Sequence, residues 1–475
     1  EDGARGRARG LTRRISDLIV GDEDATAALD RATHAARCLP GVGWQERLRG
    51  ESPNGPTEVF LAKVRQQVRA RSARPDDAYG IECTPDPPVE GLPEVATALI
   101  RALEELRAPL LDLKKCLLAR LDDEADELMT GERVRIEAAV NGLDYRAANL
   151  LAAWISMLQG LVGPRPEGVV DWFALHRAWG READVAYHRH IIDPTEPFAD
   201  VVLKPAHGAI ITSASLRDRS RGGDDVDGEG DDWSTAEART GLRHLVRPAE
   251  RISVPSPFDY AAATRILVVG DVRRDRMEEI ASAYRELFLA AGGGALGLFT
   301  AIRRLRAVHE RLVDPLEHAG LPLYAQHVDP IDTPTLVDIF RAERNSCLLG
   351  TDAVRDGVDV PGDALRLIVF DRVPWPRPDI LHKARRAAFG GKAYDDMLTR
   401  LKLKQAYGRL LRRQGDRGVF VMLDSMLPSR LCDAFPSDVE VERVGLADAV
   451  ATVRSFLAVE RQGAGGLTDL AGGNL

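Results

Sequence analysis

The sequence has 475 residues, of which 44% are hydrophobic, and its 73 acidic side chains exceed its 64 basic ones to give a formal net charge of -9 at pH 7. That length predicts two or three domains, each large enough to bury its own core. The acidic balance excludes a protein coated uniformly in positive charge, so any contact with nucleic acid must come from a local groove.

The cysteines and the apolar stretches exclude two further classes of protein. The cysteines are spread along the chain without close pairs, at Cys38, Cys83, Cys116, Cys347 and Cys432. This spacing excludes a zinc or iron–sulfur knot evident from sequence and fits a reducing cytoplasm, where we expect the protein. The most apolar stretch, 149–163, is shorter than the ~20 residues of a membrane-spanning helix, so we expect no membrane attachment. The chain opens on Glu1 in an Arg-rich run, which we interpret as an internal start without a signal peptide.

Residues 1–165 have the pattern of helices. Leucines recur at helical spacing between 110 and 128, and clusters of Pro and Gly at 52–56 and 84–93 separate the segments. Asp123-Glu124-Ala125-Asp126 spells a DEAD box inside this region. A Mg²⁺-binding carboxylate of that kind must end a buried strand, whereas this one follows charged residues in the middle of a predicted helix. We therefore predict an all-helical bundle with an exposed acidic face at 123–126.

From 166 the pattern changes to shorter alternating segments. The clearest candidate strand is 184–192, on which His188 and His190 share one face. A metal site and a pair of hydrogen-bonding histidines both fit that spacing, and the lack of a nearby cysteine favours the histidine pair. A second apolar strand is predicted at 209–211, ending in the small hydroxyl residues Thr212 and Ser213.

The remainder of the chain predicts a linker, a second lobe and a tail. Residues 217–250 are rich in Asp, Gly and Arg, as expected of a connector. After it, we predict strands at 266–269, 296–300, 321–325, 347–350, 365–370 and 419–423, and helices at 277–291, 302–318, 334–342 and 393–413. Alternating strands and helices are typical of a parallel sheet covered on both faces, so 251–462 is predicted to be an α/β, RecA-like lobe, followed by a flexible tail at 463–475.

Two glycine-rich stretches imitate nucleotide-binding motifs. Gly292 to Gly297 satisfies G-x-G-x-x-G, but it follows a predicted helix and precedes a predicted strand, which is the reverse of a dinucleotide site. Gly390-Gly391-Lys392 lacks the upstream Gly and the following Ser or Thr of a phosphate-binding loop. We recognise no Walker A motif in the sequence.

Four short motifs remain, and their order is informative. They are Thr212-Ser213-Ala214-Ser215, Pro255-Ser256-Pro257-Phe258-Asp259-Tyr260, Gly357-Val358-Asp359-Val360-Pro361-Gly362 and Gln405-Ala406-Tyr407-Gly408-Arg409-Leu410-Leu411-Arg412. On a helix Arg409 and Arg412 would project from one face. Between about 165 and 460 the series resembles the later motifs of the DinG/XPD branch of superfamily 2 DNA helicases.

The resemblance implies the C-terminal portion of an ATP-dependent DNA helicase that moves 5′ to 3′ on single-stranded or forked DNA, acts as a monomer and serves DNA repair. It implies that 1–165 is an arch-like insertion and that 166–216 ends a first RecA-like lobe, which would hold most of the ATP and Mg²⁺. Helicases of this branch often carry four clustered cysteines around an iron–sulfur cluster. Because the sequence cannot supply them, we expect no such cluster.

The resemblance also implies roles for particular residues. Contacts with ATP would come from Gly357, Asp359, Gln405, Arg409 and Arg412, of which the two arginines would be catalytic and reach the γ-phosphate. Thr212 and Ser213 would couple the nucleotide state to DNA, and Phe299, Thr300, Thr351 and Arg355 would lie toward DNA. Arg355-Asp356 departs from the aromatic–Glu pair common at this point of the family.

A second hypothesis is a motor-dead nucleic-acid-binding or regulatory protein that lacks the lobe with the Walker A motif. The genomic reading frame upstream of Glu1 separates the two hypotheses, because only a complete motor requires a phosphate-binding loop there.

Overall fold

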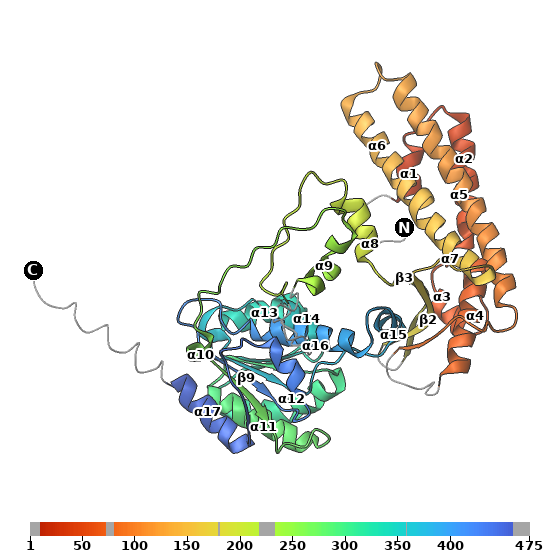
Figure 1. Cartoon of the computed structure of the whole chain (residues 1–475). Helices are drawn as coiled ribbons and strands as arrows, with labels where there is room; N and C mark the ends of the chain where they lie inside the picture. Colours follow the sequence, from red (N-terminus) through yellow and green to blue (C-terminus); the bar gives the residue numbers. More distant parts are fainter. Residues whose placement is uncertain (1–9, 73–79, 179–180, 218–232, 358, 459–475) are drawn as a thin grey trace, which may run out of the picture. The chain divides into compact units, whose positions relative to one another are not determined.

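The computed structural model describes residues 10–72, 80–178, 181–217, 233–357 and 359–458 (Figure 1). Contacts divide the chain into two compact units, Glu1–Asp193 with Pro378–Arg385, and Pro194–Arg377 with Arg386–Leu475. The predicted tail at 463–475 and part of the predicted linker lie outside the described residues. None of the described helices combines the length and the apolar character that a membrane span requires.

The first unit is built around one long helix, α5. Its helices are α1 (Leu11–Ser16), α2 (Glu23–Ala35), α3 (Trp44–Arg49), α4 (Gly55–Arg71), α5 (Leu92–Asp123), α6 (Thr130–Asp144) and α7 (Ala152–Val162). α5 buries leucines three to seven residues apart, including Leu99, Leu106 and Leu113, against α2, α4, α6 and α7. These helices confirm the helical character predicted from the leucine spacing.

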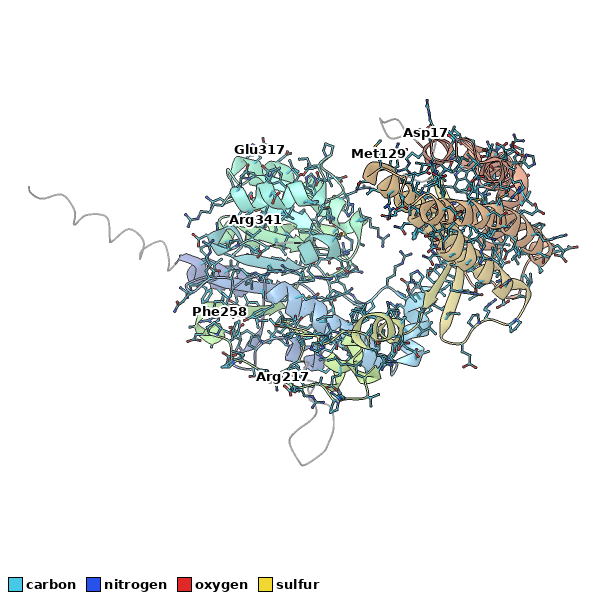
Figure 2. The ribbon with its side chains drawn as sticks, turned by 90° about the horizontal axis from the view of Figure 1, so that it is seen from above. Asp17, Met129, Arg217, Phe258, Glu317 and Arg341 are labelled. Atoms are coloured by element: carbon cyan, nitrogen blue, oxygen red, sulfur yellow. The ribbon has the colours of Figure 1, made fainter. Side chains whose placement is uncertain are left out.

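The DEAD sequence does not lie in the middle of a helix, so that detail of the prediction was wrong. α5 ends at Asp123, and Glu124 is its C-cap. The chain turns here because Leu128 packs back on the same core as Leu121. The turn that follows is exposed and carries Met129, whose side chain is 72% exposed (Figure 2). The acidic side chains at 123–126 end no strand.

A three-stranded antiparallel sheet completes the first unit. Its strands are β1 (Ile81–Cys83), β2 (Val169–Ala178) and β3 (Arg181–Ile191), with β2 in the centre. β1 departs from the all-helical prediction, because Ile81 pairs with Leu175 of a strand that is distant in sequence. Phe173, Leu175 and Val185 point to one face of the sheet and join the helical core. The first half of α15 (Ile380–Ala388) belongs to this unit, where the N–H of Ile380 donates to the Glu82 carboxylate (2.9 Å).

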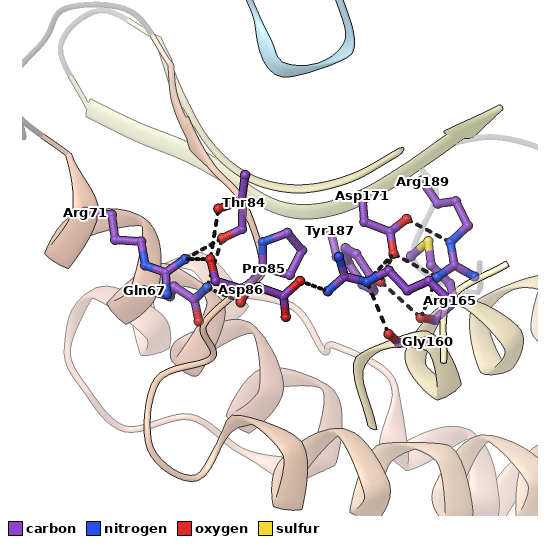
Figure 3. A network of polar contacts seen from close by, with 11 residues as sticks. Gln67, Arg71, Thr84, Pro85, Asp86, Gly160, Arg165, Asp171, Tyr187 and Arg189 are labelled. Atoms are coloured by element: carbon purple, nitrogen blue, oxygen red, sulfur yellow. Dashed lines mark hydrogen bonds and ion pairs between the residues drawn. The ribbon is translucent and has the colours of Figure 1, made fainter. Parts of the chain in front are cut away.

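A buried polar network ties the β2–β3 hairpin to α7 (Figure 3). The Asp171 carboxylate, fully buried, accepts from the Arg189 guanidinium (2.7 and 2.8 Å) and from the Tyr187 hydroxyl (2.8 Å). Arg165 lies 3.6 Å from the same carboxylate and also pairs with Asp86 (2.5 Å). Burial and the bond to Asp171 raise the pKa of Tyr187. The charge of Asp171 is thus compensated inside the unit.

The second unit is a seven-stranded sheet in which all neighbouring strands are parallel. The strand order is β10-β4-β9-β8-β5-β7-β6. The strands are β4 (Thr264–Val269), β5 (Ala295–Leu298), β6 (Leu323–Ala325), β7 (Cys347–Gly350), β8 (Leu367–Phe370), β9 (Gly418–Met422) and β10 (Val441–Val444). The helices are α8 (Thr195–Phe198), α9 (Ser234–Thr240), α10 (Tyr260–Ala263), α11 (Met277–Ala291), α12 (Ile302–His318), α13 (Thr333–Ala342), α14 (Asp352–Gly357), α16 (Lys392–Tyr407) and α17 (Leu446–Ala458).

Side chains from each strand enter two separate cores. Within β4, Leu267 and Val269 pack with α11, α12 and α17, whereas Ile266 and Val268 pack with α13 and α16. Both faces of the sheet are therefore covered, as the alternation of strands and helices predicted. This architecture confirms the α/β, RecA-like lobe.

The Gly292-Gly293-Gly294 run closes α11 and opens β5. All three glycines have positive φ, and a Cβ on Gly293 would lie 2.0 Å from the carbonyl oxygen of Asn345. The run is a tight turn between a helix and a strand, so it has the structural role that its position predicted.

The strand predicted at 209–211 does not form. Ala209, Ile210 and Ile211 have no regular structure, and Ile210 is 95% exposed. The physical reason is that no described strand pairs with this segment, and an apolar run without a hydrogen-bonding neighbour does not make a strand.

Candidate functional site

A pocket of about 620 Å³ in the second unit brings together three of the four sequence motifs, since Pro255, Ser256 and Tyr260 line it beside residues of two others. Ser213 and Ser215 line it on one side, and Gln405, Arg409 and Arg412 line it on another. Its basic lining residues are Arg217, Arg239, Arg400, Lys404, Arg409 and Arg412, against the acidic Asp433 and Asp438. An excess of cations in a concave site attracts anions such as phosphate groups. This excess of positive charge is local, because the chain as a whole is acidic.

Arg409 and Arg412 follow a helix instead of lying on it, which corrects the predicted helix over 393–413. α16 ends at Tyr407, with Gly408 as its C-cap. The helix stops because Leu410 and Leu411 turn inward and are buried. The Asp416 carboxylate then accepts from the backbone N–H groups of Arg412 (2.8 Å) and Arg413 (2.7 Å) and closes the turn. Both arginines of the motif nevertheless face the same pocket.

Asp359 and Arg412, both predicted to contact ATP, lie beside each other. The Arg412 guanidinium Nε is 3.5 Å from a carboxylate oxygen of Asp359, and the two side chains are 35% and 71% exposed. The backbone carbonyl of Asp359 accepts from Arg341 of α13 (2.9 Å), which is labelled in Figure 2. Asp359 is therefore fixed through its backbone while its carboxylate remains accessible.

Between β7 and the 357–362 motif lies a short helix, α14, which ends at Gly357. It forms because the Thr351 carbonyl accepts from the N–H groups of Val354 and Arg355, and because Val354 is fully buried. The Arg355 side chain is only 5% exposed and pairs with Asp352 (2.7 Å). Its contact with DNA stays a prediction, and it would require this side chain to leave its buried position.

The other predicted DNA contacts differ in exposure. Phe299 is 2% exposed and stacks on Tyr284, with ring centroids 5.0 Å apart. Thr300 is exposed and Thr351 is partly buried, each directly beyond the end of a strand. Of this group, Thr300 offers an exposed side chain that a ligand could reach without rearrangement, whereas the Thr351 hydroxyl donates to Gln326 (2.8 Å).

Sequence reasoning missed two buried residues beside these threonines. Asp371, after β8, forms an ion pair with Arg304 of α12 (2.5 Å), and both side chains are almost fully buried. Burial raises the pKa of Asp371, and the charge and hydrogen bond of Arg304 act in the opposite direction. No sequence signal could have revealed the pair, because 67 residues separate its members and neither belongs to a motif.

The histidines of β3 form an aromatic cluster. His188 stacks on Trp172 at 4.8 Å, His190 lies 5.0 Å from the same ring, and ring nitrogens of His176 and His188 are 3.5 Å apart. Burial and the neighbouring His176 and His190 lower the pKa of His188, so its ring is neutral at pH 7. Across the described ranges, no group of three or more His, Cys, Asp or Glu could hold a metal. The expectation that the protein carries no iron–sulfur cluster stays a prediction.

The parallel sheet covered by helices on both faces defines a RecA-like lobe. Comparison with known proteins agrees: residues 284–440 match the Helicase C-terminal domain family. The chain resembles the C-terminal portion of DinG-type ATP-dependent helicases, as the order of its motifs predicted.

The relatives show the extent of this similarity. The chain is 38% identical over 196 residues to the ATP-dependent helicase DinG of Mycobacterium tuberculosis, covering 38% of this chain and 28% of the relative. It is 28% identical over 293 residues to the 3′-5′ exonuclease DinG of Bacillus subtilis, covering 59% of this chain and 30% of that relative. It is also 28% identical over 246 residues to the ATP-dependent DNA helicase YoaA of Escherichia coli, covering 50% of this chain and 36% of that relative. The matches therefore span about a third of these relatives.

Solved structures with some likeness include S. cerevisiae Dbp5 bound to RNA and ADP BeF3, with a TM-score of 0.32, 17% identity, and coverage of 46% of this chain and 52% of that one. The helicase domain of Pyrococcus furiosus Hef has a TM-score of 0.20, 11% identity, and coverage of 88% and 53%.

Proposed function

We propose that this chain is the C-terminal portion of an ATP-dependent DNA helicase that translocates 5′ to 3′ on single-stranded DNA. In this proposal residues 251–462 form the second motor lobe, and this lobe supplies Arg409 and Arg412 to the γ-phosphate of ATP. The observation that carries the proposal is the cationic pocket, because it gathers Ser213 and both arginines from segments almost 200 residues apart.

The chemistry assigned to the arginines follows from phosphoryl transfer. Negative charge on the transferred phosphoryl group needs stabilising donors, and a guanidinium presents two parallel N–H groups to phosphate oxygens. Asp359 holds the Arg412 guanidinium near the pocket until a phosphate competes for it. The chain contains no Gly-Lys-Ser or Gly-Lys-Thr sequence. The loop that cradles the phosphates, and the carboxylate that holds Mg²⁺, would therefore come from a first lobe.

The exposed apolar residues at the start of the second unit support such a lobe. Phe198 is 44%, Val201 74% and Val202 48% exposed, and Ile210 next to the Thr212-Ser213 motif is 95% exposed. Apolar side chains gathered in one segment favour burial against a neighbouring structure. We propose that 194–216 completes a first lobe, whose sheet would also supply the partner strand that 209–211 lacks. Residues 166–193 were predicted to belong to the same lobe, but their contacts group them with the first unit. Their assignment to the first lobe stays a prediction.

Coupling between ATP and DNA would run through the same pocket. The Ser213 hydroxyl accepts from the N–H of Ser215 (3.2 Å), which makes a compact turn at the pocket wall. A change of phosphate occupancy beside Arg409 and Arg412 would act directly on this turn. DNA would lie along the strand ends that carry Thr300 and Thr351, where the Thr300 hydroxyl is a donor that suits a phosphate backbone of any sequence.

The alternative is a motor-dead protein that binds nucleic acid without turnover. It predicts that the cationic pocket has no transition state to stabilise. The absence of a Gly-Lys-Ser or Gly-Lys-Thr sequence is the observation that favours it.

The test uses the complete polypeptide encoded by the reading frame that contains this chain, with duplexes carrying a single-stranded tail at the 5′ or the 3′ end. We expect DNA-stimulated ATP hydrolysis and separation of the 5′-tailed duplex only. Separation of the 3′-tailed duplex alone would refute the polarity. DNA binding without any DNA-stimulated hydrolysis would establish the motor-dead alternative.

A further inference from the structure

Four polar residues stand in a row where four neighbouring strands end. The strand order β8-β5-β7-β6 places Asp371, Thr300, Thr351 and Gln326 side by side, each one or two residues beyond its strand. Parallel strands end at the same edge of a sheet, and ligands of such sheets bind at the carboxyl edge. The outer two residues are buried, and each accepts hydrogen bonds from the inner neighbour.

At one end of the row, Gln326 holds Thr351. The Gln326 amide oxygen accepts from the N–H (3.0 Å) and the hydroxyl (2.8 Å) of Thr351, while its NH₂ group donates to the Thr333 hydroxyl (3.0 Å). Gln326 is 5% exposed, so the arrangement is rigid. Both donors of Thr351 are therefore occupied within the protein.

At the other end, Asp371 holds Thr300 through the backbone alone. One carboxylate oxygen accepts from the Thr300 N–H (3.3 Å), and the other accepts from Arg304 (2.5 Å). Within the described residues the Thr300 hydroxyl makes no hydrogen bond, and the residue is exposed. Two residues further on, α12 begins without a side-chain cap on its first N–H groups. A free hydroxyl beside the positive end of a helix of 17 residues suits a phosphate group.

The Arg304–Asp371 ion pair is not explained by a gain in folding stability. Replacement of a buried ion pair by apolar residues of similar volume is often neutral or stabilising. Here Nη2 of Arg304 is also buried and has no hydrogen-bond partner among the described residues, which adds to the cost. A buried pair of this kind is better explained by what it holds in place.

We propose that Asp371, with Arg304 as its counter-ion, is a positioning residue that holds the backbone of Thr300 so that the Thr300 hydroxyl donates to a phosphate of single-stranded DNA. This inference rests on the proposed function, because it concerns the DNA contact assigned there to Thr300. The inference adds the Arg304–Asp371 pair, which does not contact DNA itself and acts only by positioning the loop after β5.

The experiment compares two double variants of the 475-residue chain by fluorescence anisotropy with a labelled oligothymidylate of about 20 nucleotides. Arg304→Gln with Asp371→Asn removes both charges and keeps an oxygen to accept from Thr300. Arg304→Met with Asp371→Leu removes both charges and the acceptor. Removing the charges together avoids leaving one of them buried alone. Thr300→Val is the reference for loss of the hydroxyl.

We expect the Gln/Asn variant to bind within about twofold of the unaltered chain, and the Met/Leu variant to bind about tenfold more weakly, as Thr300→Val does, since one hydrogen bond to a charged group is lost. Adding Thr300→Val to the Met/Leu variant should cause no further loss. Asp371→Glu keeps the charge and displaces the acceptor by one methylene, so it should also weaken binding, and it tests the contact even where the Met/Leu variant unfolds.

The outcomes separate the inference from the proposed function. Failure of the unaltered chain to bind, or unchanged binding by Thr300→Val, would remove the DNA contact itself. Weak binding by Thr300→Val together with unchanged binding by the Met/Leu and Asp371→Glu variants would leave the DNA contact standing and overturn the positioning role of Asp371.

Discussion

At the scale of single residues, Arg412 is held at its backbone and free to exchange partners at its tip. Asp416 fixes the backbone N–H, and the guanidinium lies near the accessible carboxylate of Asp359. The neighbouring Arg413 shares the contact with Asp416 but is exposed and does not line the pocket. The two adjacent arginines therefore form a matched pair for a test of catalysis.

By the proposed function, Arg412→Ala in the complete polypeptide should lower ATP turnover by a factor on the order of 10³ or more, because a transition-state donor would be lost. Nucleotide binding should stay nearly intact. Arg412→Lys should restore little, since an ammonium does not reproduce the two-pronged contact of a guanidinium. Steady-state ATPase assays beside a nucleotide titration measure both quantities, with Arg413→Ala as the control. Turnover near the wild-type value in Arg412→Ala would remove this residue from the mechanism.

At the scale of elements, the β2–β3 hairpin depends on a buried charge. Asp171 compensates the charge of Arg189 inside the first unit, and Phe173 and Leu175 of the same hairpin pack into the apolar core of that unit. Breaking such a pair by removing one partner costs on the order of 3 kcal/mol, because the remaining charge is buried without compensation. A surface pair in the same unit, Arg31 with Asp112, has both side chains 57% exposed and should contribute little.

Asp171→Asn should therefore loosen the hairpin while leaving the second unit unchanged. The measurement is amide hydrogen exchange followed on peptides that cover 169–191. We expect exchange there to accelerate by a factor on the order of 100, which corresponds to the lost stabilisation. Asp112→Asn is the control, and its exchange should match that of the unaltered chain. Equal protection in both variants would show that the ion pair does not support the hairpin.

At the scale of the whole molecule, the chain carries a RecA-like lobe and a separate, mainly helical unit. The cationic pocket lies within the second unit and needs no residue of the first. In the proposed function the pocket would supply positive charge for phosphoryl transfer, and no recognisable loop in the sequence cradles a triphosphate. By the proposed function, the described lobe is one half of a nucleotide site.

The 475-residue chain on its own should not hydrolyse ATP, with or without single-stranded DNA, because the donors of the pocket have no bound triphosphate to act on. Release of inorganic phosphate measures this directly. The Arg412→Ala form of the same chain is the control for a contaminating ATPase. DNA-stimulated turnover that Arg412→Ala abolishes would place a complete nucleotide site within this chain.

The sequence by itself determined the elements whose signals are local. The apolar runs of β4, β7, β8 and β9 and the spacing of leucines in α5 follow from the periods of strand and helix, which neighbouring residues set. Such signals fade where a strand is partly exposed, as in β10, which was not predicted. The motif order also gave the resemblance to DinG-type helicases, because motifs keep their chain order whatever the packing.

The tertiary structure alone decided the features that depend on distant partners. α16 ends before Arg409 because Leu410 and Leu411 enter the core. α14 forms because Val354 is buried in the core. The segment 209–211 is not a strand because no described strand pairs with it, and a strand exists only with a neighbour. The Arg304–Asp371 pair joins residues from separate elements. Local patterns specify which conformation a segment favours, whereas burial and long-range hydrogen bonds select where it stops and which side chains meet.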